Sequence, residues 1–134
     1  MKFILLLFGI GLCSGLELTA ETFEKWEKLV SPHIDKCQTE TNVDPEVAQN
    51  FYKQFYFPND KNFQCYVKCI AVKLNFMDSS GKINVDVLTE ATDKESGQIA
   101  EECSKLLTKT DLCEIAFEFS TCCMKKSAEL YGHH

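Results

Sequence analysis

The chain has 134 residues, too few for two ordinary domains, and carries 20 acidic against 14 basic residues for a formal net charge of −6. This excess of acids disfavours nucleic-acid binding, which needs clustered Lys and Arg side chains to neutralise phosphates. An acidic surface of this kind mainly keeps a protein soluble and monomeric.

The N-terminal residues have the pattern of a secretory signal peptide. Lys2 supplies a positive charge, Phe3–Leu12 is a nearly unbroken apolar run, and small residues end the pattern at Gly15. The run of ten residues is too short to span a bilayer, which needs about 20. We therefore predict a signal peptide at 1–15, a single mature domain at 16–134, and a secreted, extracellular protein.

Helical periodicity recurs along the mature chain, whereas no segment alternates cleanly enough to favour a strand. The expected helices run, in chain order, from about Thr19 to a kink or break at Pro32, from Asp44-Pro45 to a break at Pro58, and over 61–77, 85–91, 94–107 and 112–130. The expected N-caps are Asp44, Asn59 or Asp60, and Thr110 or Asp111. Residues Asp78–Gly81 are expected to form a plain turn, because the flanking residues cannot complete a calcium loop.

The sequence offers no catalytic constellation. It contains no Gly-x-Ser-x-Gly, His-Glu-x-x-His or phosphate-loop motif, so we predict no enzymatic activity, no cofactor and no metal site. The histidines are His33, His133 and His134. His133 and His134 are more typical of a solvated tail than of a metal site, and His33 is either polar surface or a pH sensor.

Eight cysteines in a short secreted chain predict a disulfide framework. Cys13 leaves with the signal peptide, so seven remain and at least one thiol is left over. Cys65 and Cys69 emerge from one helix face and should reach different partners. Cys113 and Cys122 lie about 180° apart around the last helix, which should therefore be bridged on two sides within the core. These spacings leave the connectivity open, since six cysteines allow fifteen pairings.

The six-cysteine spacing identifies the family that the chain resembles. The gaps are 27, 3, 33, 9 and 8 residues, of which the gaps of three and eight are the most diagnostic. The local text that also matches is Asp35-Lys36-Cys37 with Thr41-Asn42-Val43, the segment Cys65–Ile70, Gly81-Lys82-Ile83, and the segment Asp111–Phe117. Over essentially the whole mature chain, this pattern resembles the insect odorant-binding proteins (the pheromone-binding and general odorant-binding family).

The resemblance implies an all-α fold, a compact six-helix domain stapled by three interlocked disulfides around an apolar cavity. The implied pairs are Cys37–Cys69, Cys65–Cys113 and Cys103–Cys122. Cys123 departs from the family pattern. It is either a buried free thiol or the site of an intermolecular disulfide, and an exchange of roles between Cys122 and Cys123 stays open.

The resemblance also implies a ligand pocket between the third, fourth and last helices. The matching positions are Phe63, Val67, Ile70, Phe76, Leu88, Ala116, Phe119 and Tyr131. One orienting hydrogen bond is expected from a hydroxyl of Tyr52, Tyr56, Tyr131 or Ser120. Such a bond would favour an alcohol, aldehyde, ester or acid over an alkane.

The predicted function is that of a secreted carrier that reversibly binds a small hydrophobic ligand, such as an odorant or pheromone, without catalysis. The expected partners are this ligand and, indirectly, a membrane chemoreceptor, with the protein as a monomer or weak homodimer. The alternative is a secreted interaction or signalling protein without a ligand cavity, dimerising through Cys123. That alternative predicts a filled core and a doubled mass without reductant.

Overall fold

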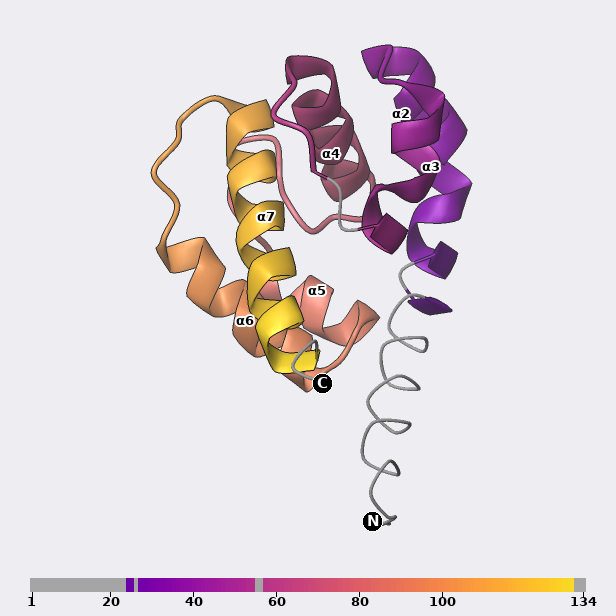
Figure 1. The fold of residues 1–134 in the computed structure, drawn as a ribbon. Coiled ribbons are helices and arrows are strands. Elements are labelled where there is room, and N and C mark those ends of the chain that lie inside the picture. The colour runs from indigo at the N-terminus through magenta and orange to yellow at the C-terminus, as the bar shows by residue number, and fades with distance from the viewer. Residues whose placement is uncertain (1–23, 26, 55–56, 132–134) are drawn as a thin grey trace, which may run out of the picture.

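The regular structure of this computed structural model is helical, with an isolated antiparallel bridge between Met77 and Ile83 (Figure 1). The structure describes residues 24–25, 27–54 and 57–131, without the side chains of residues 50, 52–54 and 130–131. The all-α prediction is confirmed for this part of the chain. The predicted signal peptide and the two C-terminal histidines lie outside it.

Seven named elements follow one another along the described chain. They are the 3-10 helix η1 (Ser31–His33) and the α-helices α2 (Ile34–Thr41), α3 (Pro45–Gln54), α4 (Lys61–Lys73), α5 (Val85–Ala91), α6 (Lys94–Lys105) and α7 (Leu112–Tyr131). Residues 24–25 and 27–30 before them are also helical.

Helix α2 was not predicted. Pro32 does interrupt the first helix, but it lies in the first turn of η1, where its missing N–H costs no hydrogen bond, and the helix resumes directly as α2. Cys37 is the residue of α2 that is buried, so the sequence carries no apolar stripe there. The helix ends at Asn42, whose φ of 58° is the left-handed conformation that terminates helices.

Helix α4 ends at Lys73, four residues before the predicted end at Met77. Asn75 adopts a left-handed φ of 62°. Its N–H donates to the Val72 carbonyl at 3.0 Å, and the Phe76 N–H donates to the Ala71 carbonyl at 2.9 Å. These two bonds give hydrogen-bond donors to carbonyls of the last helical turn. The chain leaves the helix at this point, and Met77 forms the bridge with Ile83.

Aspartates cap the N-termini of four of the helices, where each carboxylate accepts a backbone N–H that has no partner within the helix. The carboxylates of Asp44, Asp60, Asp93 and Asp111 accept hydrogen bonds from the backbone N–H groups of Glu46, Phe63, Ser96 and Glu114. Of the alternative N-caps that were predicted, Asp60 rather than Asn59 caps α4, and Asp111 rather than Thr110 caps α7. At the other end of α6, the prediction extended to residue 107, but the helix ends at Lys105, and Leu106 is 60% exposed.

Helices α4 and α7 form the centre of the fold. Helix α4 packs against α2 and α3 on one side and against α7 on the other (Figure 1). Helix α7 also packs against α6, and α6 in turn packs against α5. Close contact between α5 and α6 requires Gly97, because a Cβ there would meet the Thr89 side chain.

Three disulfides connect these layers. Cys37–Cys69 joins α2 to α4, Cys65–Cys113 joins α4 to α7, and Cys103–Cys122 joins α6 to α7. This is the pairing that the family resemblance implies. It ties α7 to two different neighbours, as the positions of its cysteines on opposite sides of the helix predict.

Candidate functional site

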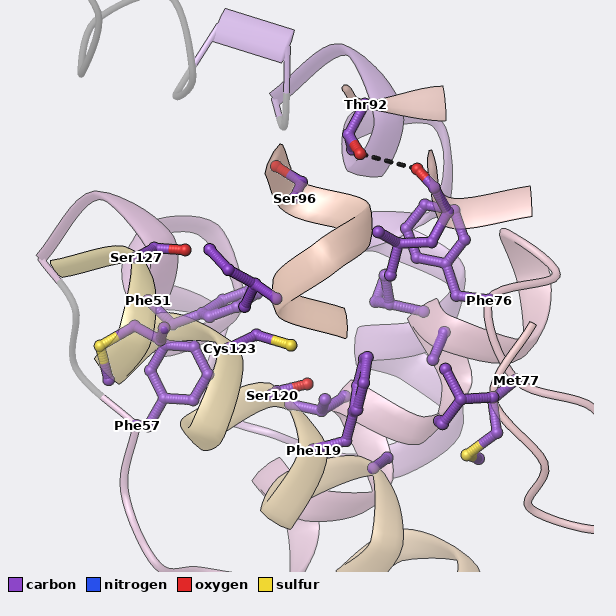
Figure 2. A pocket seen from close by; sticks show the side chains of 18 of the residues that line it. Phe51, Phe57, Phe76, Met77, Thr92, Ser96, Phe119, Ser120, Cys123 and Ser127 are labelled. Atoms are coloured by element: carbon purple, nitrogen blue, oxygen red, sulfur yellow. Dashed lines mark hydrogen bonds between the residues drawn. The ribbon is translucent and has the colours of Figure 1, made fainter. Parts of the chain in front are cut away.

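A cavity of about 210 Å³ lies among α4, α5, α6 and α7. Val67 and Ile70 of α4 form one wall, continued by Phe76 and Met77 from the turn that follows the helix (Figure 2). Ile83 and the α5 side chain of Leu88 extend the same apolar surface. The cavity therefore sits where the apolar faces of several helices meet without filling the space between them.

Helix α7 supplies the opposite wall with a regular stripe of side chains. Ala116, Ser120, Cys123 and Ser127 follow one another at intervals of four, three and four residues, which places them on one helix face. Phe119 and Met124 also line the cavity from the same helix. The stripe combines small and polar residues, so it leaves room in front of the helix instead of filling it.

An aromatic cluster closes the cavity on the side of α3. The rings of Phe51 and Phe57 line it and meet edge to face, with centroids 5.4 Å apart. Behind them, the Phe63 ring lies 5.4 Å from Phe51 and 5.7 Å from Phe57. Tyr66 completes the cluster and donates its hydroxyl to the Ala48 carbonyl at 2.9 Å.

Most of the predicted pocket residues do line the cavity. They are Val67, Ile70, Phe76, Leu88, Ala116 and Phe119. Phe63 does not: it is 0% exposed, and its ring packs edge to face against Phe51 and Phe57, which do line the cavity. The side chain of Tyr131 lies outside the described part of the structure. Contact of any of these residues with a ligand stays a prediction.

Of the hydroxyls proposed to orient a ligand, that of Ser120 lines the cavity. The side chains of Tyr52, Tyr56 and Tyr131 are outside the described residues. Ser96, Ser127 and Cys123 also line it, and these residues were not predicted as part of the pocket. The two α7 residues could have been found by extending the helical spacing from Ala116 and Ser120 along that helix.

Cys123 is the free cysteine of the described chain, and its neighbour Cys122 forms the bridge. Burial raises the pKa of the Cys123 thiol to about 12, an effect that the nearby Lys126 ammonium only partly offsets. The protonated thiol behaves as a small, weakly polar part of the wall. Because it faces the cavity, it is poorly placed to bridge two copies of the chain (Figure 2).

The remaining candidate groups lie away from the cavity or outside the description. His33 is half-buried at the junction of η1 and α2 and is not among the residues that line the cavity. Within the described ranges, no cluster of three or more His, Cys, Asp or Glu side chains could hold a metal ion. The helices in those ranges include none that is long and apolar enough to cross a bilayer.

The curated proteins that the chain resembles are insect odorant-binding proteins. It is 29% identical over 112 residues to general odorant-binding protein 57c of Drosophila melanogaster, covering 81% of this chain and 72% of that protein. It is 24% identical over 135 residues to odorant-binding protein 22 of Aedes aegypti, covering 97% of this chain and 94% of that protein.

Solved structures of insect odorant-binding proteins share the fold. A fatty acid binding protein, OBP56a, from the oral disk of the blowfly Phormia regina superposes with a TM-score of 0.60 at 22% identity, over 79% of this chain and 95% of that one. Odorant binding protein 7 from Anopheles gambiae, with four disulfide bridges and in complex with an azo compound, superposes with a TM-score of 0.62 at 22% identity. The match covers 80% of this chain and 89% of that one. The family sequence model described as the PBP/GOBP family matches residues 19–126. The chain therefore belongs to the PBP/GOBP family of odorant-binding proteins.

Proposed function

We propose that the protein is a secreted carrier that reversibly binds one small hydrophobic ligand in this cavity, without chemical turnover. The observation that carries the proposal is the apolar cavity of about 210 Å³ between helices that disulfides hold together. Apolar cavities of about 150 Å³ already admit benzene. A volatile molecule of odorant size is therefore a ligand of suitable size and polarity.

The chemistry of the lining supports binding without catalysis. The titratable side chains among the described lining residues are Lys25, Asp93 and Cys123. Lys25 is exposed, the Asp93 carboxylate accepts the Ser96 N–H at 2.7 Å, and the Cys123 thiol is protonated at neutral pH. These groups do not form a nucleophile and base in contact, the arrangement that acyl or proton transfer requires.

Family membership supports the ligand class and the setting. The relatives are named as odorant-binding proteins, and the two solved relatives bind a fatty acid and an azo compound. From these relatives we infer that the ligand of this protein is hydrophobic and that the protein is secreted after removal of residues 1–15. We also infer an indirect role in delivering the ligand to a membrane chemoreceptor.

The test is displacement of the fluorescent probe N-phenyl-1-naphthylamine from the oxidised mature protein, residues 16–134, by volatile alcohols, esters and alkanes. We expect saturable one-to-one binding with a micromolar Kd. Ala116→Phe should weaken probe binding at least tenfold, because the new ring occupies the cavity. Ala128→Phe, on an exposed position of the same helix, is the matched control and should bind like the wild type.

Two outcomes would count against the carrier proposal. One is absence of probe binding by a protein whose three disulfides are confirmed by mass spectrometry. The other is equal loss of binding in the Ala116 and Ala128 variants, which would place the probe on the surface. Either outcome, together with a doubled mass without reductant, would favour the alternative of an interaction protein dimerising through Cys123.

A further inference from the structure

The cavity approaches the surface at the connection between α5 and α6. Two lining residues of this connection, Thr92 and Asp93, are half-buried, and so is Ser96 in the first turn of α6. By contrast, the lining residues Phe76 and Met77 are only 4% and 1% exposed. Figure 2 shows Thr92 and Ser96 well apart from Met77 across the cavity. The cavity is therefore closed by the core on one side and only partly covered beside this connection.

Helices α5 and α6 form one unit. Helix α5 packs mainly against α6 (Figure 1). The two helices approach so closely at Gly97 that a Cβ there would meet the Thr89 side chain. Only Thr92 and Asp93 separate them, and the Asp93 carboxylate caps α6 by accepting the Ser96 N–H at 2.7 Å. A displacement of one of these helices therefore carries the other with it.

This helix pair is fixed at both of its chain ends. Before α5, the Asn84 N–H donates to the Phe76 carbonyl at 2.8 Å, and the Asn84 side-chain amide makes a second bond to the same turn, also at 2.8 Å. Near the end of α6, Cys103 is bridged to Cys122 of α7. Lys94, the first residue of α6, lies about 13 Å along the helix axis from Cys103. The connection between the helices is therefore the part of the pair most distant from its disulfide.

Little apolar surface holds the pair against the rest of the core. The buried residues of α5 and α6, both of which the structure describes in full, are Leu88, Gly97, Ala100 and Cys103. Leu88, at 8% exposed, is thus the one large aliphatic side chain that these two helices bury, and it lines the cavity. Ile99 adds a half-buried contact. Segments with few buried apolar contacts open at a low cost in free energy.

The half-buried edge of the cavity beside α3 is more firmly held. Phe57 lies at this edge, and its ring meets those of Phe51 and Phe63 edge to face, with centroids 5.4 and 5.7 Å apart. Such aromatic pairs add stability beyond the area that they bury. Opening at this edge would break that packing, whereas opening at the α5–α6 connection mainly withdraws Leu88.

We infer that the α5–α6 pair opens as a flap about Asn84 and the Cys103–Cys122 bridge, and that the ligand enters and leaves beneath residues 92–96. Leu88 is the latch that holds the flap closed. Movement about fixed ends is a common way for proteins to admit a ligand to an enclosed site. The inference rests on the proposed carrier function and adds the route of the ligand to it.

The test is stopped-flow fluorescence with N-phenyl-1-naphthylamine, which gives association and dissociation rate constants for wild type, Leu88→Ala and Ile70→Ala. Ile70 is the matched control, because it has the same number of carbon atoms, is 3% exposed and lines the cavity from the fixed helix α4. Leu88→Ala should raise the association rate constant about fivefold or more, since the closed state loses its main apolar contact. Ile70→Ala should weaken binding through faster dissociation, with association within about twofold of wild type.

Folding of each variant is checked by its three disulfides and its helical circular dichroism. If Leu88→Ala does not fold, Leu88→Val takes its place and should raise the association rate constant about twofold. The inference is overturned, with the carrier function intact, if the Leu88 variant associates like wild type or if Ile70→Ala accelerates association equally. An equal acceleration by Lys25→Ala, at an exposed residue of the lining, would also overturn it by placing the barrier at the N-terminal segment. If the probe does not bind wild type, the carrier function itself fails, and this inference fails with it.

Discussion

Cys122 and Cys123 show how one step along a helix decides the chemistry of a cysteine. Successive residues differ by about 100° around an α-helix. Cys122 therefore meets Cys103 of α6, while Cys123 faces the cavity. Cys122 forms a disulfide and Cys123 stays a protonated thiol, because the other six cysteines of the described residues are paired with one another.

We expect the Cys123 thiol to react slowly with N-ethylmaleimide. With a pKa of about 12, only about one thiol in 10⁵ is ionised at pH 7. Labelling, followed by intact-mass spectrometry, should accelerate about tenfold per pH unit between pH 7 and 9 and should slow when ligand fills the cavity. Cys123→Ser should not label at all. Labelling at pH 7 as fast as that of glutathione would contradict the buried position of this thiol.

At the scale of an element, the connection between α6 and α7 depends on one carboxylate. Glu118 of α7 accepts hydrogen bonds from the Thr108 hydroxyl at 2.7 Å, the Thr108 N–H at 2.9 Å and the Lys109 N–H at 3.2 Å. These bonds, led by the Thr108 hydroxyl, lower the pKa of Glu118 below its usual value. They hold the loop against α7, next to the Cys103–Cys122 disulfide.

Glu118→Gln should lower the thermal stability of the protein at pH 7 and have little effect at pH 3. Because the folded-state pKa is lowered, the carboxylate stabilises the fold fully above its ordinary pKa of 4.5, and this contribution is lost as the pH falls through the lower folded value. Solvent screening limits the effect to less than about 1 kcal/mol. The measurement is the difference in Tm between variant and wild type at the two pH values. Glu129→Gln, on an exposed position of α7, is the control, and a difference that persists undiminished at pH 3 would contradict the assignment.

For the whole molecule, the disulfides fix where the helices around the cavity lie relative to one another. Helix α7 is bridged to α4 near its start and to α6 near its middle, so the two walls of the cavity share one central helix. A core that is not fully packed loses dispersion contacts around the open space. The disulfides offset that loss by reducing the conformational entropy of the unfolded chain.

Removal of individual bridges should separate stability from binding. In a Cys123→Ser background, replacing Cys65 and Cys113 by Ser should cost about 4 kcal/mol of unfolding free energy, against about 3 kcal/mol for Cys103 and Cys122, because the sequence separations are 48 and 19 residues. Guanidinium titrations would measure both values. Probe affinity should nevertheless fall more on loss of Cys103–Cys122, since that bridge fixes α6 beside the face of α7 that carries Ser120 and Ser127. The opposite order of binding losses would contradict this view of the cavity.

The sequence alone was sufficient for the parts of the fold that depend on local chemistry. Aspartates and prolines marked helix starts such as Asp44-Pro45, and the spacing of Cys113 and Cys122 predicted a last helix bridged on two sides. The resemblance in cysteine spacing implied the pairing that the structure contains. Helix α2 was not predicted because it buries mainly Cys37. The end of α4 was not predicted correctly because it depends on the left-handed backbone conformation of Asn75.

Only the tertiary structure decided which apolar side chains face open space. Periodicity shows which face of a helix is buried, but it does not show whether a neighbouring helix fills the volume in front of that face. Phe63 and Val67 lie one turn apart on α4, yet Phe51 and Phe57 enclose the first while the second borders the cavity. For the same reason Ser96 and Ser127, on different helices, line one cavity only because the Cys103–Cys122 bridge and the packing of α6 on α7 bring those helices together.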